Sequence, residues 1–206
     1  MMSNPSDEIA RAAARLLMEH TEGDIRSAIR AARSQVDGDP SEPPPTRERV
    51  RRHLVAMQQQ SMGYELWARL RLGMLAAIEE CMVALAWAID DIELRLAGEA
   101  ARGQFDGTTS VSMRLHSTID DRALFRVLED IEFEIAAVGV QESRHGRLTR
   151  IVAESEEFDL VILRCPQRTM VEEPVNLVTG RPVPIVDQAA LAALIAQGLS
   201  DVPPAD

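Results

Sequence analysis

The stretch LAGEAARGQFDGTTSVSMRL, residues 96–115, decides the fold of this chain. It follows directly on an alternating segment, residues 92–96, whose pattern predicts a half-buried strand. It ends in a second alternating segment, in which Val111, Met113 and Leu115 are the apolar positions. Between the two segments, glycines and small residues predict a turn and the start of a helix. The local pattern is therefore a strand, a glycine-bearing turn, a helix start and a second strand.

The elements on either side of this stretch predict an α+β protein in which helices precede a strand-rich core. Upstream, the apolar spacing predicts a helix through the 50s and a long helix over 65–84 that extends toward Ala88. Downstream, segments of period two alternate with helical segments. The elements expected there are a helix at 120–129, strands around 131–135, 148–153 and 158–163, and a last helix that Asp187 caps.

The N-terminal residues form a separate pattern. Apolar residues recur at helical spacing on both sides of a break at 21–23, which predicts a helical hairpin. So small a hairpin is not stable alone, so it must pack on the body or on a partner, or remain marginally ordered. A proline-rich stretch after it predicts a linker. The predicted division is a hairpin at 1–36, a linker at 37–46, an α+β domain at 47–201 and a tail at 202–206.

The composition excludes several classes of protein. All 22 basic residues are arginines. P-loop NTPases need a lysine at the β- and γ-phosphates, and Schiff-base enzymes need a lysine amine, so this chain alone performs neither chemistry. Residues 63–206 carry 24 acids against 13 arginines, which accounts for the whole formal charge of −11. An acidic body repels phosphate backbones, so the bulk charge argues against a nucleic-acid partner.

The cysteines and the apolar segments indicate the cellular setting. Cys81 and Cys165 stand apart without metal-ligand spacing, and the polar N-terminus lacks a signal-peptide core. These features predict a reduced, cytoplasmic protein with buried thiols. The most apolar stretch, residues 74–89, carries Glu79 and Glu80 in its middle, so it is expected as a core helix and not as a membrane span.

Residues 96–115 also resemble the signature of the minimal nucleotidyltransferase superfamily. That signature is a strand, the motif G-S-x-A-R-G, a short interval and S-D-x-D on the next strand. Glu99 stands at the position of the first serine, and Ser110 and Ser112 stand at the two aspartates. The positions that match the remaining motif residues are Gly98, Ala101, Arg102 and Gly103.

The resemblance implies a mixed sheet flanked by helices and a Mg²⁺-dependent transfer of a nucleoside monophosphate from an NTP. In the family, two carboxylates one residue apart point to the same side of a strand and hold two Mg²⁺ ions. A third carboxylate lies on a later strand, and Asp159 is its candidate here. The Ala-rich N-terminal helices and the turn at 178–182 are also similar to a group of small proteobacterial proteins called nucleotidyltransferase-like.

The departures from the signature predict lost catalysis. Ser110 and Ser112 are neutral, whereas Mg²⁺ prefers charged oxygen ligands. Glu99 replaces a serine that cradles the triphosphate, and a carboxylate repels phosphate. Arg102 is expected to face the cleft, where it either holds an anion or pairs with Glu99. We therefore expect a catalytically degenerate nucleotidyltransferase-like protein with a binding or regulatory role, and we assign it no metal ion and no cofactor.

Three alternatives stay open. In the first, the chain is an active enzyme that binds Mg²⁺ and an NTP through other carboxylates, such as Asp106, Asp159 or Glu134. Alternatively, it is a structural protein that binds a protein partner or a second copy of itself through the amphipathic helices of residues 1–36. The third alternative is an unrelated α+β domain that matches the motif by chance.

Overall fold

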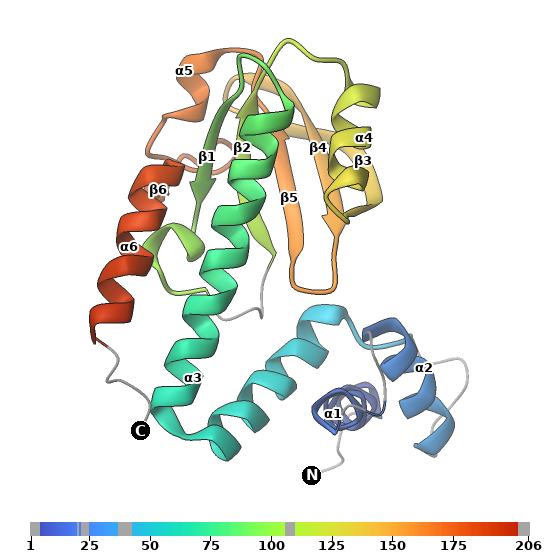
Figure 1. The fold of residues 1–206 in the computed structure, drawn as a ribbon. Helices are drawn as coiled ribbons and strands as arrows, with labels where there is room; N and C mark the ends of the chain where they lie inside the picture. The colour runs from blue at the N-terminus through green and yellow to red at the C-terminus, as the bar shows by residue number, and fades with distance from the viewer. Residues whose placement is uncertain (1–4, 20, 22–24, 37–42, 106–109, 202–206) are drawn as a thin grey trace. The chain divides into compact units, whose positions relative to one another are not determined.

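The computed structural model describes residues 5–19, 21, 25–36, 43–105 and 110–201. Its architecture is α+β, as predicted, because helices precede and flank one mixed β-sheet (Figure 1). The chain divides into two compact units between Ala68 and Arg69, and each unit is described by itself. Within the described ranges, no helix is long and apolar enough to cross a membrane.

The division between the units falls inside a helix. Residues 37–42 and the expected tail, 202–206, lie outside the described residues. The helix that spans the division is α3 (Arg47–Ala88), which is interrupted at Gly63 with φ 74° and ψ 170°. Only glycine adopts this conformation without strain. The two predicted helices, one through the 50s and one extending to Ala88, are therefore confirmed as two stretches of α3, while the domain boundaries stay predictions.

The first unit contains the predicted helical hairpin. Its helices are α1 (Pro5–Met18) and α2 (Ile25–Gln35), and the start of α3 packs against both. Fully buried alanines let the helices approach closely, and Val50 of α3 is fully buried in the same cluster. The apolar surface that so small a hairpin cannot bury alone is thus covered by residues of this chain.

Two polar contacts join the first turn of α1 to α3. Arg49 donates a hydrogen bond to Ser6 Oγ at 3.0 Å. His53 Nε2 lies 2.9 Å from Asp7 Oδ1, and this hydrogen bond is the largest cause that holds the pKa of the Asp7 carboxyl below its ordinary value. The pairing therefore contributes stability above the ordinary aspartate pKa, and that contribution is lost as the pH falls through the lowered pKa.

In the second unit, six strands of the described residues form the sheet, in the order β3-β4-β5-β2-β1-β6. The pair β2–β5 is parallel, and every other neighbouring pair is antiparallel. The strands are β1 (Glu93–Ala97), β2 (Val111–His116), β3 (Glu134–Ser143), β4 (Gly146–Glu154), β5 (Asp159–Arg164) and β6 (Ile185–Val186). The remaining elements are η1 (Ala100–Arg102), α4 (Asp121–Asp130), α5 (Arg168–Val171) and α6 (Gln188–Asp201).

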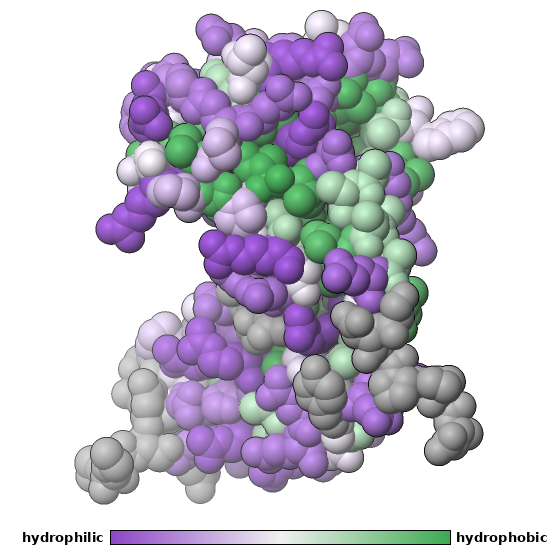
Figure 2. Space-filling model, turned by 90° about the vertical axis from the view of Figure 1, so that its left-hand side faces the viewer, coloured by the Kyte–Doolittle hydropathy of each residue, from purple (hydrophilic) through white to green (hydrophobic). Residues whose placement is uncertain are grey.

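One face of the sheet packs against helices. Alternate strand residues such as Leu96, Met113 and Leu160 are fully buried there, among side chains of α3, α4 and α6. Figure 1 shows α3 and α4 in front of this face, and Figure 2, which views the side on which α6 lies, shows apolar residues gathered there. We call this the helix face. The opposite face carries Ser112 and Arg114 of β2, and we call it the polar face.

The strand expected around 131–135 is wrong in its position. Residues 131–133 close α4, and Glu132 takes a positive φ of 68°. The strand β3 begins at Glu134 and continues to Ser143, where it turns back into β4. The sequence hides this strand because β3 is an edge strand, exposed over 136–140, and carries no alternating pattern there.

The contact between Asp7 and His53 gives a testable prediction. In a His53→Ala variant, the pKa of Asp7 should rise toward the ordinary aspartate value, because its largest stabilising partner is removed. A carboxyl-detected NMR titration of Asp7 measures this. Arg11→Ala removes a partner whose hydrogen bond to Asp7 Oδ2 is longer, at 3.3 Å, and whose effect on the pKa ranks below that of His53, so it should raise the pKa less. A rise that is equal in both variants would contradict the assignment.

Candidate functional site

The parallel pairing of β2 with β5 brings the singled-out residues together. The register places Val111 beside Leu160, and Ser110 and Asp159 immediately precede these two residues. Since the strands are parallel, Ser110 and Asp159 lie at the same edge of the sheet. The antiparallel strand β1 has Ala97 opposite Ser112, so its C-terminal end reaches that edge as well. The fold therefore brings the glycine turn, the two serine positions and Asp159 to one place.

These residues point toward the polar face. Val111 and Leu160 are buried in the core of the helix face. Because side chains alternate along a strand, Ser112 and Asp159 face the other way. Asp159 is only 9% exposed, whereas Ser110 is exposed and Ser112 is half-buried.

Backbone groups of the turn after β1 are hydrogen-bonded within the chain. Gly98, at φ 85°, donates its N–H to the carbonyl of Pro184 at 3.1 Å. The carbonyl of Glu99 accepts the N–H groups of Arg102 and Gln104 at 3.0 and 3.1 Å. The expected helix start is therefore a single turn of 3-10 helix, and Arg71 of α3 donates to the carbonyl at its end. The N–H of Gly98 is thus already bonded within the chain.

Glu99 and Arg102 form an ion pair beside this turn. The carboxylate and guanidinium lie 3.7 Å apart, and the side chains are 57% and 53% exposed. A pair this exposed contributes little to stability. Its consequence is chemical, because a negative side chain stands at the phosphate position of the signature and the nearest arginine is engaged with it.

The acids of the other strands lie farther along the sheet. The register places Glu154 beside Asp159 and Glu134 beside Glu154. Neighbouring strands are about 4.8 Å apart, so Glu134 lies about 10 Å from Asp159 across the sheet. Asp106 lies outside the described residues. In the ranges that the structure describes, no group of three His, Cys, Asp or Glu side chains is placed to hold a metal ion.

The donor set does not fit the two Mg²⁺ ions of the family. At the serine positions the strand offers neutral hydroxyls, and Asp159 supplies one carboxylate. Magnesium dehydrates reluctantly and binds through charged oxygens.

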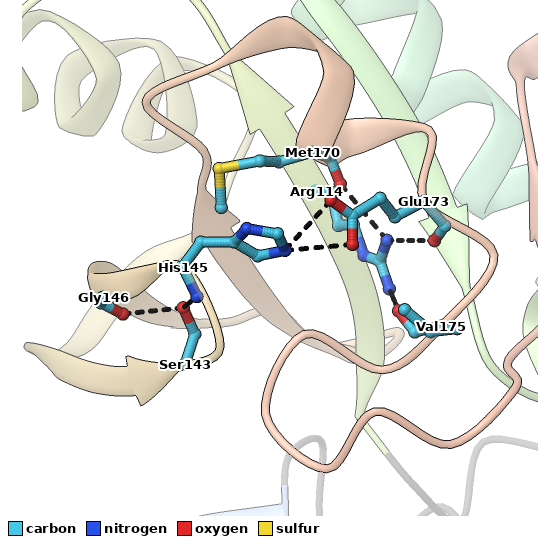
Figure 3. Close-up of polar contacts among 7 residues, drawn as sticks. All are labelled: Arg114, Ser143, His145, Gly146, Met170, Glu173 and Val175. Atoms are coloured by element: carbon cyan, nitrogen blue, oxygen red, sulfur yellow. Dashed lines mark hydrogen bonds and ion pairs between the residues drawn. The ribbon is translucent and has the colours of Figure 1, made fainter.

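Farther along the polar face, Arg114 fixes α5 and the segment that follows it. This guanidinium is 3% exposed and donates to three backbone carbonyls, those of Met170 at 3.4 Å, Glu173 at 2.6 Å and Val175 at 2.5 Å (Figure 3). Burial lowers the pKa of Arg114. Every one of these contacts is structural, so Arg114 holds protein carbonyls and is not directed toward a ligand.

A second contact holds the same segment. His145, in the turn between β3 and β4, has its Nε2 3.0 Å from the Glu173 carboxylate (Figure 3). Its backbone N–H donates to Ser143 Oγ at 3.1 Å. The sequence gives no signal for this cluster, because Arg114 occupies an alternating strand position where an exposed polar residue is expected.

Both cysteines are buried, as the sequence predicts. Burial raises the pKa of the Cys81 thiol to about 12 and that of Cys165 to about 11. Neither thiol is therefore ionised at neutral pH, which excludes both as thiolate nucleophiles.

The comparisons with known proteins give partial structural similarity. No protein-family model matches the chain, and no curated protein matches it. A structure of Cid1 in complex with the UTP analog UMPNPP is 16% identical, with a TM-score of 0.36, over 49% of this chain and 32% of that one. The Cid1 poly(U) polymerase with MgGTP bound is 14% identical, with a TM-score of 0.34, over 49% and 34%.

A structure of the GLD-2/RNP-8 complex is 12% identical, with a TM-score of 0.29, over 46% of this chain and 40% of the matched chain. The similarity is partial on both sides. This chain spans about a third of the length of the two Cid1 structures.

The role of Arg114 gives a prediction about stability. Replacing Arg114 by Met leaves three carbonyls, one buried and two partly buried, without their donor and should lower the free energy of unfolding by about 3 kcal/mol. The matched control is Arg102→Met, which removes only an exposed pair and should change stability by less than about 1 kcal/mol. Urea unfolding of both variants measures the difference. Equal losses would show that Arg114 does not hold the segment.

Proposed function

We propose that this chain is a nucleotidyltransferase-like protein that no longer transfers nucleotides and that has a binding or regulatory role. One observation carries the proposal. The edge of the sheet that gathers the glycine turn, β2 and Asp159 holds Ser110 and Ser112 where the signature has its two acids.

The missing carboxylates at positions 110 and 112 argue against nucleotide transfer. Two unit charges 4 Å apart attract each other by about 4 kcal/mol at an effective dielectric constant of 20. Two missing carboxylates therefore remove far more binding energy for two divalent cations than neutral hydroxyls replace. Asp159 alone leaves that site one negative charge.

The turn after β1 supports the same conclusion. A phosphate-binding turn offers unbonded N–H groups and no negative side chain. Here Gly98 donates to Pro184 and Glu99 adds a carboxylate. Both features disfavour a triphosphate.

The alternatives have less support. Of the substitute carboxylates, Glu134 stands two strands away from Asp159. Assembly through the N-terminal helices requires an apolar face for the partner, yet α1 and α2 pack against the start of α3 within the chain. The cytoplasmic setting, with two reduced thiols, remains part of the proposal.

A transferase assay tests the proposal directly. The chain should show no transfer of nucleoside monophosphate from labelled NTPs, with Mg²⁺ or Mn²⁺, to a panel of protein and small-molecule acceptors. Robust turnover that Asp159→Ala abolishes would establish the active alternative.

Restoring the acids gives a second prediction. The double variant Ser110→Asp/Ser112→Asp should gain Mn²⁺ binding, because it supplies the two missing charges. Thermal unfolding with and without Mn²⁺ measures this, since a ligand at 100 times its dissociation constant stabilises by about 2.7 kcal/mol. Ser110→Asn/Ser112→Asn has nearly the same shape without the charge and should not respond. Equal Mn²⁺ stabilisation of the unmodified chain would contradict the proposal.

A further inference from the structure

The helix face contains a cavity of about 430 Å³ that the nucleotidyltransferase signature does not involve. It lies between α3, the residues that close α4 and the turn from β4 to β5. Its volume falls within the range of small-molecule sites. The lining residues divide into a buried floor (Cys81, Phe133 and Phe158), half-buried walls (Ala77, Ala84, Ile131 and Ser155) and an exposed rim (Glu80, Glu132, Glu156 and Glu157).

The cavity exists because small and large side chains face each other. Ala77, Cys81 and Ala84 are spaced i, i+4 and i+7, so they form one small-residue stripe on α3. Across from them, the rings of Phe133 and Phe158 pack edge to face with their centres 5.4 Å apart. The rings form part of the floor, and the small side chains of α3 leave the space in front of the rings open.

The rim is acidic on three sides. Its four glutamates come from α3, from the end of α4 and from the turn before β5. In the described part of the chain, their carboxylates form no hydrogen bond or ion pair with the protein. They are therefore available to a cation that enters the cavity.

The thiol of Cys81 also belongs to the floor of the cavity. It is 7% exposed and borders the cavity, and among the described residues its thiol has no hydrogen-bond partner. Because burial raises the pKa of this thiol to about 12, it stays neutral and adds no charge to the floor. The floor is thus apolar, and the negative charge is confined to the rim.

We infer that this cavity binds an organic cation with an apolar body, such as an arylalkylammonium compound. The apolar body of the ligand packs against the floor of Phe133, Phe158 and Cys81, where its ring or alkyl group is removed from water. The ammonium group meets the rim carboxylates. Nucleotides and other anions are repelled by the same rim. The site is separate from the one around Asp159, since it opens on the other face of the sheet.

A binding experiment tests the ligand class. Phenethylammonium should bind saturably to the full chain in isothermal titration calorimetry, whereas 3-phenylpropionate, which has the opposite charge, should not. Glu156→Gln/Glu157→Gln should weaken phenethylammonium binding about fivefold or more. Glu142→Gln, an exposed acid on the β3–β4 hairpin, should leave it unchanged. Absent binding, equal binding of the two probes, or equal effects of the variants would overturn the inference.

Discussion

The parallel pairing of β2 with β5 is the constraint on which the rest of the second unit depends. Parallel neighbours require a long connection, and here that connection contains α4 and the β3–β4 hairpin. The crossover covers the helix face and completes the core. The same pairing places Asp159 beside Ser110 and sets the turn at 155–158 under α3. Both the candidate site around Asp159 and the cavity therefore follow from one strand pair.

Two arginines hold the connections around this pair. Arg114 of β2 binds the carbonyls of 170–175, and Arg164 of β5 binds Asp121 and the carbonyl of Ile119 at 2.5 Å. A guanidinium has several donors in a fixed plane, so it can satisfy several carbonyls at once. A lysine ammonium could not hold this geometry in the same way. Arg114 and Arg164 thus hold backbone segments beside the sheet through their hydrogen bonds.

The sequence predicts those parts of the fold that a local pattern encodes. The strands β1 and β2 alternate clearly, and the glycine turn between them is marked by its residue types, so these elements could be predicted. The place of Asp159 near them was implied only by the resemblance to the nucleotidyltransferase signature. The bounds of β3 could not be predicted, because an edge strand needs no buried face. Residues 136–140 accordingly show no alternation of apolar and polar residues. The burial of Arg114 could not be predicted either, because its partners are carbonyls about sixty residues downstream in the chain. Backbone groups leave no signature in the sequence.

The distribution of acids unites these observations. The chain has 33 acids, yet two of the three metal-binding positions of the signature hold neutral serines, Ser110 and Ser112. Carboxylates stand instead at Glu99, where they repel phosphate, and around the cavity of the helix face. A surplus of acidic residues is not by itself evidence for a catalytic metal site, because such a site needs its charges within a few ångströms of one point. At the cavity of the helix face, four glutamates surround an apolar floor, and that arrangement selects an organic cation over a hydrated metal ion.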